Sequence, residues 1–163
     1  MIVYRVGKTK WSNVLDGEGS RINGGRWNHV GDPCIYTSES RALAVLEYTV
    51  NTNIADVPRS LSITSIEIPE DIRDHPIPDL PGDWMDVPAP GSTKDLGSLS
   101  LKAKTHSVLR FPSSILPSEF NYILNPLHTN SAKFKIIDVR DFVYDIRIKW
   151  FKLLEKNKFV NSW

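Results

Sequence analysis

The chain has 163 residues, 40% of them hydrophobic and 24% charged, and 20 basic against 19 acidic side chains leave a net charge of +1. A chain of this size and composition is typical of one globular domain with its own core, so we expect a single domain over residues 1–163. The nearly neutral charge argues against direct binding to nucleic acid, which normally requires a clear excess of basic side chains. The start of the chain lacks the pattern of a signal peptide, and no apolar stretch is long enough for a transmembrane helix. We therefore expect a cytoplasmic protein that does not bind membranes.

The first quarter of the chain predicts two short strands separated by a glycine-rich loop. Apolar runs over residues 2–6 and 34–37 predict the strands, and the second contains the single cysteine, Cys34, which we expect to be a buried free thiol. Six of the nine glycines come before residue 32. We therefore expect a loop there in which the backbone closely approaches a ligand or another strand.

A helix, a strand and an irregular segment follow. Ser38 has a side chain suited to a helix N-cap, and Glu39 places negative charge in the first turn, so a helix is expected over about residues 39–50. Residues 61–68 alternate apolar and polar side chains with a period of two, which predicts a strand with one buried face. Six of the eleven prolines fall within residues 69–90. We expect that segment to be extended and to form neither a helix nor a central strand.

The second half of the chain predicts one more helix, one more strand and an amphipathic tail. Ser92 or Thr93 is expected to cap a helix that runs to about residue 109, and residues 134–139 are expected to form a strand. Residues 148–159 mix aromatic and leucine side chains with four lysines. We expect a terminal helix that packs on its own domain, with a membrane or a partner groove as the alternative. Strands and helices without a regular βαβ alternation indicate an α+β fold.

Several common catalytic motifs are absent from the sequence. Residues 17–22 begin like a dinucleotide fingerprint but have Ile22 where the third glycine belongs, and no Gly-Lys-Ser/Thr phosphate loop occurs. The four histidines are scattered and cannot form a closed zinc site with one cysteine, and there is no Gly-x-Ser-x-Gly elbow. We therefore expect neither a metal site nor serine-hydrolase chemistry.

A carboxylate and a guanidinium remain as candidates for chemistry. Glu47 follows the helical spacing of Leu43, Leu46 and Val50, and a carboxylate on an apolar face must be paired, hydrogen-bonded or neutral. The alternative is that it lies at the edge of this face and reaches water. Arg26 stands between two glycines and a tryptophan, where planar donors and a close backbone approach suit a phosphate. Its alternative is a surface ion pair beside a tryptophan that anchors the loop.

A third candidate segment has the composition of a binding rim. Hydroxyl and amide side chains surround short apolar stretches over residues 111–114 and 117–128, as the rim of a ligand site requires. A plain turn followed by a strand explains the same composition.

Together, these segments resemble the RES domain, a family of bacterial toxins named for an arginine, a glutamate and a serine. The resemblance covers about residues 1–148 and leaves residues 69–90 and the tail 149–163 without a matching motif. Its motifs fall, in order, on residues 4–6, 17–19, 24–28, 31, 35–38, 42–47, 112–113, 121–128 and 142–147.

The resemblance implies a fold and an activity. The fold would be an α+β fold similar to ADP-ribosyltransferase toxins, with an NAD cleft. The activity would be degradation of NAD at the bond between nicotinamide and ribose, by hydrolysis or phosphorolysis, with NAD as substrate and no metal. The alternatives are a toxin that transfers ADP-ribose from NAD to a protein, and a non-enzymatic module that binds NAD or a partner.

The resemblance also implies functional residues, position by position. The position of the serine is the least fixed, because Ser114 follows the matching residue directly. The implied catalytic residues are Arg26, Tyr36, Glu47 and Ser113, and the implied NAD-binding residues are Arg5, Arg26, Tyr36, Ser113 and Asn125.

Each of these roles has a physical reason. Arg26 would donate to the phosphates of NAD, and Glu47 would stabilise the positive charge that develops on the ribose as the nicotinamide bond breaks. Tyr36 would stack against nicotinamide, and Ser113 would hydrogen-bond the ligand or orient Glu47. Nicotinamide leaves as a neutral group, so no strong general acid is required.

The last implication of the resemblance is a partner. Family members pair with an Xre-type antitoxin that covers the active site and itself binds DNA. We therefore expect a hetero-oligomer with such an antitoxin, in which this chain makes no contact with DNA.

Overall fold

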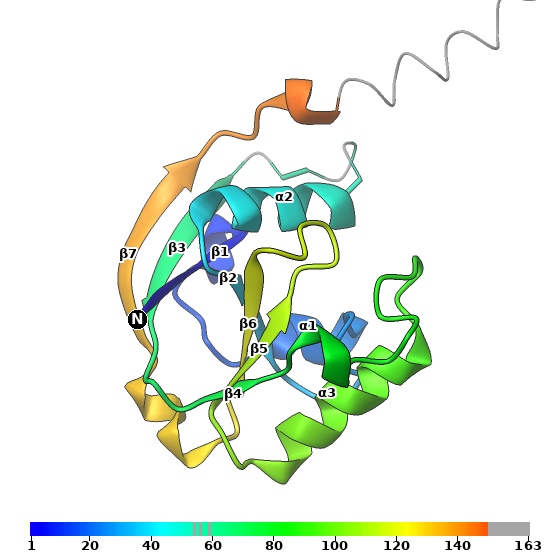
Figure 1. The fold of residues 1–163 in the computed structure, drawn as a ribbon. Helices are drawn as coiled ribbons and strands as arrows, with labels where there is room; N and C mark the ends of the chain where they lie inside the picture. The colour runs from blue at the N-terminus through cyan, green and yellow to red at the C-terminus, as the bar shows by residue number, and fades with distance from the viewer. Residues whose placement is uncertain (54, 56, 59, 150–163) are drawn as a thin grey trace, which may run out of the picture.

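A seven-stranded mixed sheet forms the centre of the computed structural model, which describes residues 1–53, 55, 57–58 and 60–149 (Figure 1). The strands are β1 (Ile2–Lys8), β2 (Ile35–Ser38), β3 (Leu61–Glu67), β4 (Ile72–Asp74), β5 (Val108–Pro112), β6 (Phe120–Leu124) and β7 (Lys135–Phe142). Their order in the sheet is β4-β5-β6-β2-β1-β3-β7. All neighbours are antiparallel except β4 and β5, which are parallel.

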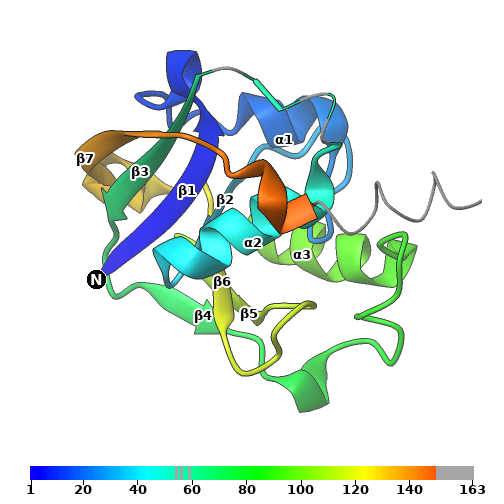
Figure 2. The ribbon, with the colours of Figure 1, turned by 90° about the horizontal axis from the view of Figure 1, so that it is seen from above.

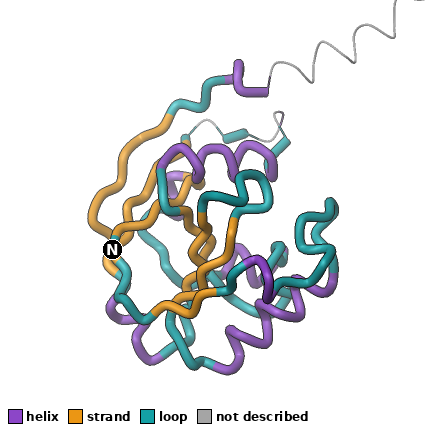
Figure 3. Tube along the Cα trace, viewed as in Figure 1, coloured by secondary structure: helices purple, strands orange, loops and turns teal. Residues whose placement is uncertain are grey.

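Within the described residues, three α-helices pack around this sheet. They are α1 (Glu18–Asn23), α2 (Arg41–Asn51) and α3 (Gly91–Ala103). Helix α2 crosses the upper end of the sheet in Figure 1, while α1 and α3 lie on the side away from β1, β3 and β7, as the view from above in Figure 2 also shows. None of the helices in the described part of the chain is long and apolar enough to cross a membrane. Figure 3 shows that loop fills most of the chain between β1 and β2 and between β4 and α3.

The sheet has a seam between β1 and β2. These strands are paired only where Tyr4 lies opposite Ser38, whereas β1 pairs with β3 along its whole length, from Ile2 opposite Glu67 to Lys8 opposite Leu61. Strands β1, β3 and β7 therefore form one half of the sheet, and β2, β6, β5 and β4 form the other.

Apolar side chains are buried on both faces of the second half. Along β6, Tyr122 and Leu124 belong to one core cluster and Ile123 to another, because successive side chains of a strand point to opposite faces. Trp27, from the loop after α1, joins the second cluster by stacking on Phe111 of β5 with ring centroids 3.8 Å apart. This stack holds the glycine-rich loop against the sheet.

The α+β class and all four predicted strands are confirmed, although β3 is buried on both faces and not on one as expected. The strands expected over residues 2–6, 34–37, 61–68 and 134–139 correspond to β1, β2, β3 and β7. The segment 69–90 contains no α-helix and no central strand, as expected, but it does contain a short 3-10 helix, Ile77–Asp79. It also contains β4, which its parallel pairing with β5 places at the edge of the sheet.

The N-cap expected at Ser38, for the helix that corresponds to α2, is wrong by two residues. Ser38 still belongs to β2, and Ser40 caps α2 instead, because its hydroxyl accepts a hydrogen bond from the main-chain N–H of Leu43 at 3.0 Å. The expected apolar face also differs, since Val50 is 53% exposed, while the buried residues of α2 are Leu43, Ala44 and Thr49.

The end expected at about residue 109, for the helix that corresponds to α3, is wrong too. Helix α3 ends at Ala103, where Lys104 adopts a left-handed conformation with a φ of 49°, and the residues near 109 belong to β5. Its N-cap is Pro90; Ser92 donates instead to Asp83. The short helix α1 and the strand β5 were not expected, whereas β6 agrees with the turn and strand given as the alternative for residues 117–128. The terminal helix expected over residues 148–159 lies outside the described residues from 150 onward.

Candidate active site

A cleft with a volume of about 880 Å³ opens beside the seam of the sheet. Strands β1 and β2, helix α2, the loop between α1 and β2 and the loop before α3 all contribute to its walls. The volume falls within the range of sites that bind small molecules and cofactors. Four of the residues implied by the resemblance line this cleft: Arg5, Arg26, Tyr36 and Glu47.

Glu47 is held by two donors that both reach the same carboxylate oxygen. Its Oε1 accepts a hydrogen bond from Ser113 Oγ at 2.8 Å and another from Asn121 Nδ2 at 2.5 Å. Ser113 follows β5 and Asn121 lies in β6, so two neighbouring strands position a side chain that comes from α2. The carboxylate is thus held in a defined orientation at the wall of the cleft.

The hydroxyl of Ser113 has a defined role in this contact. Ser113 is fully buried, and its Oγ accepts main-chain hydrogen bonds from Ile115 at 3.1 Å and Leu116 at 3.2 Å. Because both lone pairs of Oγ are used, its proton is directed to Glu47. Ser114 lines the cleft but makes no hydrogen bond within the described residues, so the geometry favours Ser113 as the serine that positions Glu47.

The hydroxyl of Tyr36 holds the glycine-rich loop in place through two hydrogen bonds. Its hydroxyl accepts from the main-chain N–H of Trp27 at 2.9 Å and donates to Asn28 Oδ1 at 2.8 Å. Burial raises the pKa of Tyr36 well above its ordinary value, so the phenol stays neutral. A Cβ on Gly25 would overlap the Tyr36 hydroxyl, which explains why the loop needs glycine at that position.

Arg26 connects the loop after α1 to the loop before α3. Its Nη1 donates to the main-chain carbonyls of Trp84 at 2.6 Å and Asp86 at 3.1 Å. Burial lowers the pKa of Arg26, and the charge of Glu47 opposes this shift. The hydrogens on Nε and Nη2 make no contact within the described residues, so they remain available to a ligand.

Arg5 lines the cleft, but its guanidinium is engaged elsewhere. Nη1 donates to the carbonyl of Val14, and Nη2 donates to those of Trp11 and Ser12, all at 3.0–3.1 Å. Burial lowers the pKa of Arg5. The side chain therefore anchors the loop after β1, and it has fewer donors left for a ligand than Arg26.

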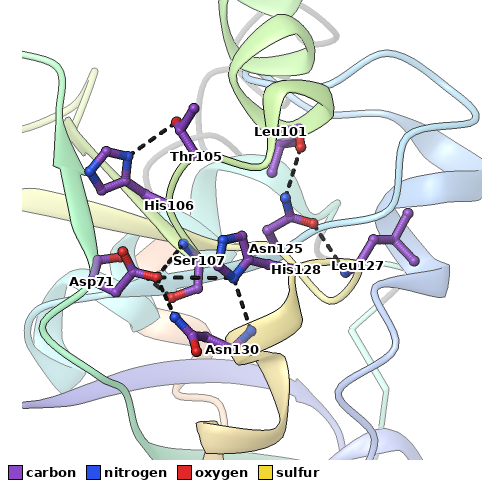
Figure 4. Close-up of polar contacts among 9 residues, drawn as sticks. All are labelled: Asp71, Leu101, Thr105, His106, Ser107, Asn125, Leu127, His128 and Asn130. Atoms are coloured by element: carbon purple, nitrogen blue, oxygen red, sulfur yellow. Dashed lines mark hydrogen bonds and ion pairs between the residues drawn. The ribbon is translucent and has the colours of Figure 1, made fainter.

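Asn125 is not brought to the cleft, contrary to its implied place among the NAD-binding residues. Its Nδ2 donates to the carbonyl of Leu101 at the end of α3 (2.8 Å), and its Oδ1 accepts from the N–H of Leu127 (3.1 Å), as Figure 4 shows. Asn125 follows the end of β6, about 13 Å along the strand from Asn121 at the usual rise per residue. It belongs with the hydrogen-bonded cluster around Asp71 in Figure 4, away from Glu47.

Two functional candidates were missed by sequence reasoning. Asn121 lies in the same motif segment as Asn125, and only the pairing of β6 shows which of the two asparagines faces Glu47. Lys94, in the first turn of α3, lines the cleft. It makes no ion pair with any residue that the structure describes.

The cleft has a positive balance of charge. Its charged lining residues within the described part of the chain are the cations Arg5, Arg26 and Lys94 and the single anion Glu47. Among those same residues, no group of three or more histidine, cysteine or acidic side chains gathers as a metal site would require. The arrangement suits an anionic ligand whose reacting part lies beside one fixed carboxylate.

Comparisons with known proteins show the family to which the chain is similar. The RES domain family matches residues 2–146. A protein of Photorhabdus laumondii named Toxin Res is 37% identical over 155 residues, which are 91% of this chain and 97% of that protein. A protein of Sphingobium named Prs ADP-ribosylating toxin is 34% identical over 145 residues, which are 86% of this chain and 90% of that protein.

A solved structure shows the same fold. It is a chain of the toxin–antitoxin complex MbcT–MbcA of M. tuberculosis, with a TM-score of 0.72 at 17% identity. The match covers 87% of this chain and 84% of that one.

Proposed function

The chain belongs to the RES domain family, and from this premise we propose that it is the toxin of a toxin–antitoxin pair and degrades NAD at the bond between nicotinamide and ribose. The observation that carries the proposal is the fixed carboxylate of Glu47 in a cleft whose other charged lining residues, within the described part of the chain, are all cations. This combination matches a substrate with two phosphates and a reacting centre that becomes positive.

Glu47 would act on the ribose. As the nicotinamide bond breaks, positive charge develops at the ribose carbon, as it does in the cleavage of glycosides. A carboxylate that is already oriented stabilises this charge without reorganisation. Because Ser113 and Asn121 both donate to Oε1, the other oxygen is left to face the ribose or one of its hydroxyls.

The cations would bind the pyrophosphate. Arg26 retains the donors of Nε and Nη2, and the Lys94 ammonium lies in the same cleft. Arg5 would contribute mainly by holding its loop, since three carbonyls occupy its guanidinium. Tyr36 would offer its ring to nicotinamide while its hydroxyl keeps the glycine-rich loop in place.

The acceptor defines the competing activities. Water or inorganic phosphate would give NAD degradation, whereas a side chain of a target protein would give ADP-ribosylation, the activity in the printed name of the Sphingobium relative. Purified protein incubated with NAD, with and without phosphate and cell extract, separates these outcomes. Nicotinamide release without extract supports degradation, and the phosphorylated ADP-ribose product marks phosphorolysis. Label that appears only on one protein supports the transferase.

A binding module without catalysis is the second alternative, and Glu47→Gln tests it. The variant keeps the shape of the side chain but removes its charge. We expect NAD to bind still while turnover falls by about 100-fold or more, the usual cost of losing one preorganised electrostatic group. Unchanged turnover would show that Glu47 is not catalytic, and no turnover by either protein would support a binding module.

The partner would be an antitoxin of the Xre type acting in the cytoplasm. A chain that removes NAD requires an inhibitor in its own host, and the cations of the cleft favour an acidic group or a terminal carboxylate as the blocking element. With a net charge of +1, this chain would leave DNA binding to the partner. Expressing the chain alone in a bacterium should arrest growth as NAD falls, and Arg26→Ala should restore both. Normal growth with steady NAD would contradict the proposal.

A further inference from the structure

We infer that Ser38 and Asn121 form a relay that selects which oxygen of Glu47 faces the ligand, so both are positioning residues for the proposed reaction. The kinetic consequences of this inference rest on the proposed function, whereas its structural content does not. Neither residue touches the reacting atoms; each acts through Glu47.

The relay follows from the register of two neighbouring strands. Ser38 ends β2 and lies directly opposite Asn121 of β6, and side chains at paired positions of an antiparallel ladder share one face of the sheet. Ser38 Oγ donates to Asn121 Oδ1 at 2.7 Å, and Asn121 Nδ2 donates to Glu47 Oε1 at 2.5 Å. The three side chains thus form one line of hydrogen bonds from the sheet to α2.

Each proton in this line has only one consistent direction. An ionised carboxylate can only accept, so Asn121 must turn its NH₂ group toward Glu47. Its carbonyl oxygen then faces Ser38, which is buried and supplies the matching donor. Without the Ser38 hydroxyl, nothing in this line would hold the amide of Asn121 in that orientation.

Ser113 and Asn121 together make Oε1 the oxygen of Glu47 that is held by the protein's own hydrogen bonds. Both donors reach Oε1, whereas Oε2 accepts no hydrogen bond from any residue that the structure describes. A carboxylate that had one donor on each oxygen would have less capacity for a ligand on either. The relay therefore reserves one oxygen for the scaffold and one for the ribose.

The first experiment observes the relay in the protein without NAD. The side-chain amide of Asn121 is followed by ¹H–¹⁵N NMR and assigned by its disappearance in Asn121→Ala. One of its two protons should resonate downfield, because it donates to a carboxylate. Its resonance should move in Glu47→Gln and in Ser38→Ala but not in Ser114→Ala. A resonance that ignores both Glu47→Gln and Ser38→Ala would overturn the inference.

The second experiment measures kinetics on NAD. Asn121→Ala should lower kcat about tenfold with little change in KM, in line with the loss of a hydrogen bond to a charged group. In the Glu47→Gln background, the same change should add almost nothing, since a relay that acts through Glu47 has no effect once its charge is gone. The exposed Asn13 is the matched control, and Asn13→Ala should leave kcat unchanged. Equal effects of Asn121→Ala in both backgrounds would show an independent structural role and overturn the inference.

A third variant, Asn121→Asp, keeps the shape of the side chain and adds a pH signature. At low pH the introduced carboxyl is protonated and donates to Oε1 as the amide does, but at higher pH it faces Glu47 as a second negative charge. Activity relative to wild type should therefore fall by about tenfold or more between pH 5 and 8. Other charged groups around this pair are Arg26, which interacts with Glu47, and Glu119, which accepts from Ser40. They are common to both proteins and cancel in the ratio. A flat ratio would contradict the relay.

The three experiments separate failure of the relay from failure of the proposed function. If the wild-type chain releases no nicotinamide but the NMR resonances respond as expected, the relay stands and the proposed reaction fails. If nicotinamide is released but neither the resonances nor kcat respond, the reaction stands and the relay is overturned.

Discussion

At the scale of single residues, the direction of one proton distinguishes two adjacent serines. Ser113 Oγ accepts two main-chain hydrogen bonds and therefore gives its own proton to Glu47. The hydroxyl therefore both closes the turn after β5 and orients the carboxylate of Glu47. Its neighbour Ser114 makes neither contact within the described residues. The sequence alone does not show which of the two serines contacts Glu47.

Ser113→Ala should therefore reduce activity and stability together. We expect kcat to fall by 10- to 100-fold, about the value of a hydrogen bond to a charged group. The free energy of unfolding should fall by about 1–3 kcal/mol, because two buried N–H groups lose their acceptor. Nicotinamide release and chemical denaturation measure the two effects. The control Ser114→Ala should change both quantities little, and equal losses in the two variants would contradict the assignment.

The residues also show where sequence reasoning reaches its limit. Glu47, Arg26, Tyr36 and Ser113 could be named from motif positions; the first three line one cleft, and Ser113 is buried and donates to Glu47. The choice of Asn125 could not be corrected from the sequence. Two asparagines four residues apart have the same parity on a strand, and only the pairing of β6 with β2 shows which one lies beside Glu47.

At the scale of elements, β3 was predictable from its alternation of apolar and polar side chains, although both of its faces are buried in the structure, and β5 was not. The alternation in residues 61–68 identifies β3, whereas Val108 and Leu109 are both buried on opposite faces of β5 and look like the end of a helix. Helix α3 ends before the expected residue 109 because Lys104 adopts a left-handed conformation. Lysine rarely adopts this conformation, so the sequence does not indicate the end of the helix. Boundaries of this kind depend on tertiary packing, which a local pattern does not contain.

The contact between α3 and the loop after α1 depends on one glycine. A Cβ on Gly97 would overlap the main chain of Trp27, including its carbonyl carbon at 2.7 Å. Gly97→Ala should therefore push α3 away from the loop and lower the free energy of unfolding by about 3 kcal/mol, the upper range for overpacking. Denaturant titration measures this loss.

Gly91 provides the control in the same helix. A Cβ on Gly91 would meet nothing within 4 Å, so Gly91→Ala should keep stability unchanged or raise it by less than about 1 kcal/mol. If the two glycine variants had equal stability, the close packing of α3 on Trp27 would not be a determinant of the fold.

At the scale of the whole molecule, one buried histidine gives the fold a response to acid. His75 stacks on Phe111 with ring centroids 4.4 Å apart, in line with the stack of Phe111 on Trp27. Burial lowers the pKa of His75 to about 4. Between its unfolded value near 6.5 and this value, the unfolded chain binds a proton that the folded chain does not.

Stability should therefore fall as the pH is lowered from 6.5 to 4. We expect a loss of about 2 kcal/mol over this window from His75, measured by denaturation at a series of pH values. His75→Phe keeps an aromatic ring in the stack and removes the titrating group, so its stability should change less across the same window. Asp71 and Asp74, whose pKa values are lowered by hydrogen bonds from Asn130 and Arg110, add their own losses only below about pH 4. A steep decline that persists in His75→Phe would assign the acid response to other groups.

The seam between β1 and β2 has a consequence for synthesis. The chain crosses it on the way from β1 to β2, returns for β3, crosses again to β4 and returns once more for β7, so neither half of the sheet is a continuous piece of sequence. Arg26 and Glu47 leave the ribosome early, but Ser113 and Asn121, which orient the carboxylate, come late. A nascent chain that stops before Ser113 lacks both donors, and one that stops before β6 still lacks Asn121. Translation itself thus withholds the completed site until most of the protein has been made, and a partner produced beforehand would meet this chain as soon as its site is complete.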